Sequence, residues 1–332
     1  MISVPETVLP RRRGLALAAV LPFTIAACSS AATEAEVTTE ATPTDISVVA
    51  TTTIWSDVTS AALCGLDVPA VMPPGADPHV FEPALADRAT LEAADLVVAN
   101  GLYLEEGMVD LLSTVAAGGV RVIELTENAD VLEFGGGHDD HDDHDDHAEH
   151  ESQDHDDHDH SGGDPHIWFD PLAVAEVVPT IVEAAIAAGA DTSVRACGQD
   201  YIDELEALDT EIRATLSAIP DDARYLVTNH DALGYFAARY DFEVVGTVIP
   251  SLSSLAETNP ADLADLAAII EELDIPAVFA EYQAADTEAN ALAEVLPGVS
   301  VATLDSGSLR DSNDSYITFM RRNTQVIAEA LG

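Results

Sequence analysis

Histidines on short proline loops are the residues of this sequence that could do chemistry. Outside a histidine-rich run, the chain has three histidines: His79, His166 and His230. The tripeptide Asp-Pro-His occurs twice, at 77–79 and 164–166, and ends in two of them. Because Pro fixes its own φ and pushes the preceding residue towards extended backbone, the His is presented on a stiff loop. Stiff presentation suits a metal ligand. The alternative is that each tripeptide is a turn with a surface His.

The third His and one Asp also follow predicted strands. His230 lies in Thr-Asn-His-Asp at 228–231, where a strand ends and a helix begins, and Asp305 lies in Leu-Asp-Ser-Gly at 304–307. In open α/β sheets, ligands bind at the carboxyl ends of the strands. Both residues are therefore candidate ligands. The alternative for His230 is a position near a helix N-terminus with no further role, and an Asp after a strand is common.

A run of eight His and twelve acidic residues occupies 138–160, between Gly-Gly-Gly and Ser-Gly-Gly. It has almost no apolar residue, so we expect a disordered surface loop over 136–163. We expect it to hold several ions loosely through accessory ligands, namely His138, His141, His144, His147, His150, His155, His158 and His160. Our hypothesis is that it gathers metal for the main site. The alternative is a solubilising loop that binds metal incidentally.

The elements that position these residues alternate between strand and helix. Strands are predicted at 46–52, 67–72, 96–100 and 120–125, and then at 224–229, 242–249, 276–280 and 299–304. Helices are predicted at 54–63, 85–94, 105–116 and 171–188, and then at 233–240, 260–273, 287–296 and 316–331. This order predicts an α/β fold with parallel sheets of four strands in each half, covered by helices on both faces.

The longest helical pattern covers 193–219. Apolar residues recur in it at three- and four-residue spacing, at Tyr201, Leu205, Leu208, Ile212 and Leu216. That spacing predicts one helix of about seven turns with an apolar stripe. It is longer than the usual helix of about 10–14 residues. We therefore expect it to link an N-terminal lobe at 45–192 to a C-terminal lobe at 220–332.

Composition excludes some partners. The chain of 332 residues is 47% apolar, enough for two lobes with cores. Its formal net charge is −49 and its basic side chains are all Arg. Such acidity argues against nucleic acid or an anionic membrane surface as a direct partner. It suits a surface that attracts cations, although a general bias such as adaptation to salt would give the same charge outside the run.

The N-terminus has the pattern of an export signal. Three Arg at 11–13 precede an apolar stretch at 14–27 that is too short to cross a membrane. It ends in Ile-Ala-Ala-Cys, which resembles a bacterial lipobox, so 1–28 is predicted to be a lipoprotein signal peptide with Cys28 lipidated. The polar stretch 29–44 would be a flexible tether to the outer face of the cytoplasmic membrane. An ordinary signal peptide is the alternative, and Sec and twin-arginine export both stay open.

Two further cysteines, Cys64 and Cys197, would lie in an oxidising compartment. We hypothesise that they form one disulfide, because they are the only Cys left after lipidation. Two buried free thiols are the alternative.

Five segments carry a resemblance: GADPHVFEP at 75–83, the His-rich run, DPHIWFDP at 164–171, VTNHDALGYFAARY at 227–240, and the Asp of TLDSGS at 303–308. Together they resemble one family, the ZnuA-like (cluster A-I) zinc- and manganese-binding lipoproteins of bacterial ABC importers. They occur in the family's order and spacing, and the resemblance covers 46–332. It implies two (β/α) lobes joined by one long rigid helix, with a metal in the interlobe cleft.

The resemblance also implies the ligands, which are His79, His166, His230 and Asp305. Three neutral imidazoles and one carboxylate suit four-coordinate Zn²⁺. The family's manganese binders usually carry Glu where this chain has His230, which favours zinc. Two departures are Tyr after Glu281, where the family often has Pro, and the absence of the typical acidic pattern at 250–258. Glu281 stays open as an extra or competing carboxylate.

The function implied is a monomeric, extracytoplasmic, high-affinity zinc-binding subunit that delivers Zn²⁺ to an ABC permease and its ATPase. Zinc would be the transported ligand and not a catalytic cofactor. The alternatives are a subunit for manganese or another divalent metal, and a surface metal buffer or adhesin. We do not expect an enzyme, since four protein ligands leave no open position for water and the chain lacks nucleophile, phosphate-loop and dinucleotide motifs.

Overall fold

The computed structural model describes residues 46–133, 163–249, 251–256, 258–283 and 287–332. The predicted signal peptide 1–28 with Cys28, the tether 29–44 and the eight accessory histidines of the run lie outside the described residues. The first lobe denotes residues 46–192 and the second lobe residues 220–332.

The sheet of the first lobe is parallel and has the strand order β1-β2-β3. Its strands are β1 (Val48–Ala50), β2 (Leu96–Ala99) and β3 (Arg121–Glu124). The strand predicted at 67–72 is reduced to one parallel bridge between Ala50 and Ala70. Four strands were predicted here and three form, because Pro69 has no N–H to donate and two further prolines follow Met72.

The sheet of the second lobe has the four parallel strands that were predicted, in the order β5-β4-β6-β7. They are β4 (Tyr225–Thr228), β5 (Glu243–Thr247), β6 (Ala277–Glu281) and β7 (Ser300–Leu304). Because all of these strands are parallel, their carboxyl ends meet at one edge of the sheet. The prediction of two parallel α/β lobes is confirmed.

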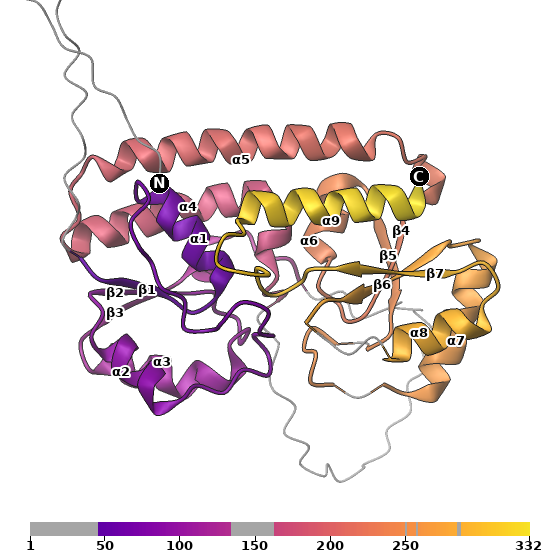
Figure 1. Ribbon diagram of the computed structural model, residues 1–332, viewed down its shortest axis with the longest axis horizontal. Coiled ribbons are helices and arrows are strands. Elements are labelled where there is room, and N and C mark those ends of the chain that lie inside the picture. The colour runs from indigo at the N-terminus through magenta and orange to yellow at the C-terminus, as the bar shows by residue number, and fades with distance from the viewer. Residues whose placement is uncertain (1–45, 134–162, 250, 257, 284–286) are drawn as a thin grey trace, which may run out of the picture. The chain divides into compact units, whose positions relative to one another are not determined.

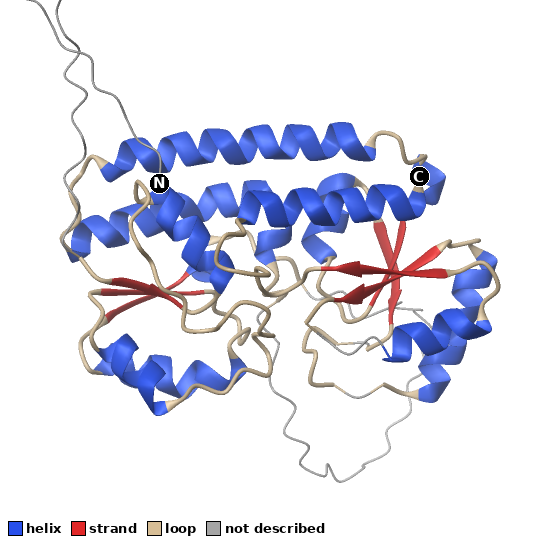
Figure 2. Cartoon of the chain, viewed as in Figure 1, coloured by secondary structure: helices blue, strands red, loops and turns tan. Residues whose placement is uncertain are grey.

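Helices cover the sheets (Figure 2). In the first lobe they are α1 (Thr53–Ala62), α2 (Leu85–Glu92), α3 (Val109–Ala117) and α4 (Pro171–Ala188). In the second lobe they are α6 (Gly234–Tyr240), α7 (Pro260–Glu272), α8 (Thr287–Val295) and α9 (Tyr316–Leu331). Single 3₁₀ turns are η1 (Glu106–Met108), η2 (Leu125–Asn128), η3 (Ile167–Phe169) and η4 (Asp221–Ala223).

The helix starts follow from local sequence. Asp170 caps α4 by accepting from Leu172 N–H, and Pro171 occupies the first helical position. Asn259 caps α7 in the same way and is also followed by Pro at the first helical position. The helix predicted at 105–116 begins instead as the turn η1, and α3 follows it. This turn brings Gly107 so close to the Phe81 carbonyl that a Cβ there would lie 2.4 Å from the oxygen.

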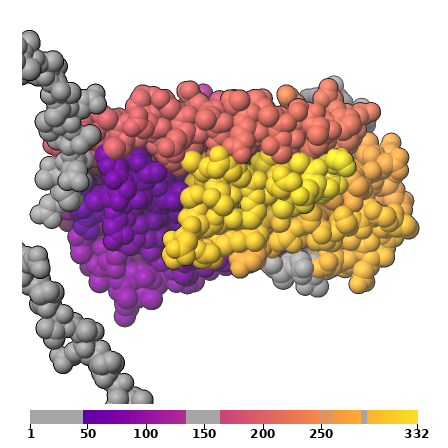
Figure 3. Space-filling view, turned by 45° about the horizontal axis from the view of Figure 1, so that its top comes forward, coloured from indigo at the N-terminus to yellow at the C-terminus, as the bar shows by residue number. Residues whose placement is uncertain are grey.

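The long helix α5 (Val194–Leu216) reaches from one lobe to the other (Figure 1). The apolar stripe predicted for it is buried at all five positions, Tyr201, Leu205, Leu208, Ile212 and Leu216. It packs along α4 and α1 of the first lobe and along α9 of the second. Figure 3 shows α5 and α9 side by side on one face of the molecule. The predicted linking helix is therefore present.

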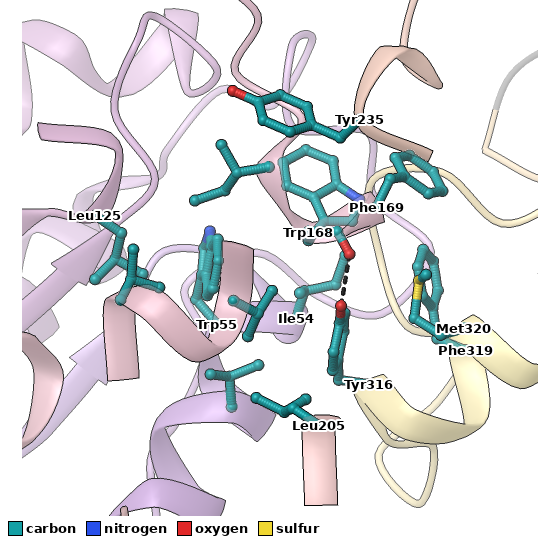
Figure 4. Close-up of a cluster of buried hydrophobic side chains, with 14 of the residues drawn as sticks. Ile54, Trp55, Leu125, Trp168, Phe169, Leu205, Tyr235, Tyr316, Phe319 and Met320 are labelled. Carbon is teal, nitrogen blue, oxygen red and sulfur yellow. Dashed lines mark hydrogen bonds between the residues drawn. The ribbon is translucent and has the colours of Figure 1, made fainter. Parts of the chain in front are cut away.

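One hydrophobic core runs through both lobes beneath these helices. Figure 4 shows its centre, where Trp55 of α1, Trp168 and Phe169 of η3, and Tyr316 of α9 come together. The Tyr316 hydroxyl donates to the Trp168 carbonyl oxygen at 2.7 Å. Helix α4 is apolar and long enough to cross a membrane, but its Val174, Val177, Val178 and Ile181 are fully buried in this core. It is thus a core helix of the lobe.

Cys64 and Cys197 are joined by a disulfide, with Cα atoms 5.2 Å apart. Cys64 follows α1, and Cys197 lies in the first turn of α5. The bond therefore fixes the start of the long helix to the first lobe.

Candidate metal site

Three imidazoles converge at the boundary between the lobes. The Nε2 atom of His166 lies 3.3 Å from Nε2 of His79 and 3.3 Å from Nε2 of His230. All three side chains are buried, with 1–3% of their surface exposed. Zinc–nitrogen bonds of about 2.0–2.1 Å in tetrahedral geometry place neighbouring nitrogens roughly 3.3–3.4 Å apart. The spacing thus matches a divalent metal held by three Nε2 atoms.

The first Asp-Pro-His loop holds His79 by its backbone. Asp77 Oδ1 accepts a hydrogen bond from the His79 N–H at 3.0 Å. The ring Nδ1 of His79 makes no hydrogen bond within the described residues, and Glu106 Oε1 lies 3.4 Å from it. The carboxylate thus approaches the ring without forming a hydrogen bond to it. Glu106 belongs to η1, which explains why that short turn matters to the site.

The second Asp-Pro-His loop repeats this geometry. Asp164 Oδ1 accepts from the His166 N–H at 2.9 Å and also lies 2.8 Å from the ring Nδ1. The Pro165 carbonyl accepts from the Asn100 side chain at 2.9 Å, which ties the loop to the end of β2. Burial raises the pKa of Asp164 to about 7, although its hydrogen bond from His166 opposes this shift. The repeated tripeptide thus gives a repeated turn.

His230 follows β4, and Glu281 at the end of β6 faces its Nδ1 atom. Burial alone would raise the pKa of Glu281, but the charge and hydrogen bond of His230 outweigh it and lower this pKa to about 2. Burial lowers the pKa of His230, but the nearby carboxylates, Glu281 first among them, together raise it above its ordinary value. Ser306 Oγ donates to the other Glu281 oxygen at 2.7 Å. Glu281 therefore lies behind His230, away from the three Nε2 atoms.

Each of the three imidazoles thus has a carboxylate on its Nδ1 side. A metal-ligating His typically donates its second N–H to such a group, which fixes the tautomer and orients the ring. The sequence pointed to the three histidines but missed the roles of Glu106 and Asp164. The repeated tripeptide carried the signal for Asp164. No local pattern marked Glu106, which is brought to His79 only by the fold.

Asp305 is not brought into the imidazole cluster. It follows β7 and is fully buried. Its Oδ1 accepts from Arg310 Nε at 2.7 Å, and its Oδ2 accepts from Arg322 Nε. The prediction that Asp305 joins the histidines therefore differs from this structure, because two guanidinium groups already compensate its charge. Sequence reasoning considered the position of Asp305 after a strand and not the arginines that the chain folds onto it.

Known proteins share the sequence features of this chain and identify its family. A family model described as ZnuA, zinc-uptake complex component A, periplasmic, matches residues 48–330. The chain belongs to this family. Members of the ZnuA family bind metal outside the cytoplasm as substrate-binding components of ABC importers, together with a permease and an ATPase, and they are not enzymes.

Relatives within the ZnuA family differ in the metal that their names give. Zinc-binding protein TroA of Treponema pallidum (strain Nichols) is 28% identical over 271 residues, covering 79% of this chain and 80% of TroA. A solved TroA structure matches with a TM-score of 0.73 at 26% identity, covering 86% of this chain and 99% of that chain. Manganese-binding lipoprotein MntA of Bacillus subtilis (strain 168) is 28% identical over 275 residues, covering 80% of this chain and 82% of MntA. Iron-binding protein YfeA of Yersinia pestis is 27% identical over 335 residues, covering 95% of this chain and 97% of YfeA.

Proposed function

We propose that the protein captures Zn²⁺ outside the cytoplasm with high affinity and delivers it to the permease of an ABC importer. The observation that supports zinc most directly is the triangle of Nε2 atoms from His79, His166 and His230. Imidazole nitrogens suit zinc, whereas manganese and magnesium are better served by carboxylate and carbonyl oxygens. Each carboxylate near this triangle lies on the Nδ1 side of a ring and so supports nitrogen ligation.

A fourth ligand is needed for tetrahedral zinc. We retain Asp305 as our proposal for it, because β7 ends at the same sheet edge as β4 and β6. To reach the ion, its carboxylate must leave Arg310 and Arg322. Until an ion arrives, the two arginines compensate the charge of Asp305. In this metal-free arrangement the buried carboxylate of Asp305 is paired.

The N-terminal segment and the histidine run lie outside the described residues. We propose that Cys28 carries the lipid that anchors the monomer to the outer face of the cytoplasmic membrane. The acidic histidine run at 138–160 would gather zinc at low availability and pass it to the site. Its deletion should then leave the affinity of the site unchanged while lowering uptake at limiting zinc.

The test is a competition titration of the metal-free protein with zinc and manganese, using a protein that lacks 138–160 so that only the imidazole site is measured. The proposal expects one zinc bound per chain, at least about 100-fold more tightly than manganese. Tighter binding of manganese than of zinc would reject zinc as the ligand. The matched control is His230→Ala in the same shortened chain, which should lose most of the zinc binding.

A further inference from the structure

A loop of the second lobe, residues 251–256, is fixed directly to the segment that carries His230. The backbone N–H of Asp231 donates to the Ser251 carbonyl at 2.9 Å, and that of Ile249 donates to the Asn229 carbonyl at 2.7 Å. Inside the loop, Ser253 N–H donates to Ser251 Oγ at 3.1 Å. A movement of His230 would therefore be transmitted to Ser253 through these hydrogen bonds.

Two adjacent serines of this loop reach carboxylates of the first lobe. Ser253 Oγ donates to Glu106 Oε1 at 2.6 Å, and Ser254 Oγ donates to Asp77 Oδ2 at 2.6 Å. Ser253 is 6% exposed, so its hydrogen bond lies in a site with little water. Hydrogen bonds to an ionised acceptor are stronger than those between neutral groups. The two contacts are well suited to hold the lobes together at this loop.

Both of these carboxylates also hold His79. Asp77 uses its other oxygen, Oδ1, to accept from the His79 N–H at 3.0 Å. Glu106 presents the same Oε1 that receives Ser253 to the His79 Nδ1 atom at 3.4 Å. The Nδ1 atom is buried and makes no hydrogen bond within the described residues. A small movement of the ring would let Glu106 accept a hydrogen bond from the Nδ1–H of His79. Metal binding at Nε2 favours that movement because it makes the Nδ1–H a stronger donor.

We propose that Ser253 and Ser254 form a latch that couples closure of the two lobes to the position of His79, and so sets how long the site retains its ion. The proposal rests on the proposed metal-binding function. In the latched state, His79 is held at its backbone by Asp77 and approached at its ring by Glu106. Release of the ion then requires the two serine contacts to open, because they join the His230 segment to the carboxylates that hold His79.

The experiment measures the rate of zinc dissociation into excess chelator from the protein that lacks 138–160. We expect the double variant Ser253→Ala/Ser254→Ala to release zinc about 10-fold faster or more, and each single variant to be intermediate. Ser253→Thr, which keeps the hydroxyl, should release zinc within about two-fold of the wild-type rate. An unchanged rate in the double variant would overturn the latch.

The matched control is Ser308→Ala, another buried serine at the lobe boundary. Its hydroxyl contacts Thr53 Oγ1 and the Gly75 N–H, each at 3.0 Å, and neither carboxylate of the latch. We expect its release rate to stay close to wild type. An equal acceleration in Ser308→Ala would show a general loosening of the lobes and would reject a specific latch.

A metal-free readout separates failure of the latch from failure of the proposed function. Amide hydrogen exchange of the His79 N–H should accelerate in the metal-free double variant, because Asp77 loses its second partner. Unchanged exchange at His79 would count against the latch whatever the metal. If His79 exchange responds but the wild type binds no zinc, the metal assignment fails and the claim about ion retention fails with it, while the lobe contact stands.

Discussion

Glu281 and His230 form a buried pair in which the carboxylate faces Nδ1 of the ring and leaves Nε2 directed at His166. The carboxylate also accepts from the His230 backbone N–H at 3.2 Å and from Ser306 Oγ at 2.7 Å, so three donors surround it. His230 follows β4 and Glu281 ends β6, and these two strands are paired neighbours in the sheet. The parallel sheet therefore sets the orientation of one ligand before any ion is bound.

This pair makes zinc binding sensitive to acid. Zinc must displace the proton from Nε2 of His230. Burial lowers the pKa of this His, but Glu281, with Asp77 and Asp231, raises it above its ordinary 6.5. Zinc affinity should therefore fall as the pH drops, beginning above 6.5. Glu281→Gln removes the negative charge, lowers the pKa of His230 and should move this onset to lower pH. Competition titrations between about pH 5 and 8 measure both curves; identical onsets would contradict the role given to Glu281.

Loss of His230 should affect the site more than loss of the histidine run. His230→Ala removes one of three converging nitrogens, so we expect zinc affinity to fall about 100-fold or more. Deletion of 138–160 leaves all three nitrogens in place and should change the affinity of the site by less than about two-fold, while removing weaker ions. Calorimetry of both variants provides the comparison, and the opposite order would show that the run carries the main binding.

The arginine pair on Asp305 predicts an unusual response to mutation. If Asp305 becomes the fourth ligand, Arg322→Gln frees its carboxylate from one competitor and should tighten zinc binding several-fold. Asp305→Asn should weaken binding, but by less than His230→Ala, because the ion must first draw the carboxylate away from both arginines. Thermal unfolding of each metal-free variant serves as the control for folding. Unchanged zinc affinity in both variants would mean that Asp305 stays with the arginines.

The disulfide should contribute strongly to stability. It joins residues 133 positions apart, so reducing or removing it frees a long loop in the unfolded chain. The chain-entropy estimate for such a loop is up to about 5 kcal/mol. The double variant Cys64→Ser/Cys197→Ser should therefore unfold roughly 10 °C lower than wild type in calorimetry. A change of less than about 2 °C would show that packing of α1 against α5 suffices.

The regular elements and the three histidines could be predicted from the sequence. The apolar stripe on α5 is a local signal, and the structure has it where the pattern indicated. The repeated Asp-Pro-His tripeptide predicted a stiff loop, and both copies make the same aspartate-to-amide hydrogen bond. These features depend on residues only a few positions apart, so they can be predicted from the local sequence.

Long-range pairing could not be predicted in this way. The contact of Arg322 with Asp305 joins α9 to the end of β7, and that of Ser253 with Glu106 joins the two lobes. Both depend on how packed elements are placed. The missing strand near Ala70 shows a third limit, since an apolar run predicted a strand where only one bridge pairs with β1. An apolar run predicts that a segment is buried more reliably than it predicts that the segment pairs with a neighbouring strand.

In the proposed site, three imidazoles hold zinc. X-ray absorption at the zinc edge, on the protein without 138–160 loaded with one equivalent of zinc, tests it most directly. We expect three imidazole nitrogens at about 2.0–2.1 Å with one oxygen ligand, falling to two imidazoles in His79→Ala. A spectrum dominated by oxygen ligands, or one unchanged by His79→Ala, would contradict it.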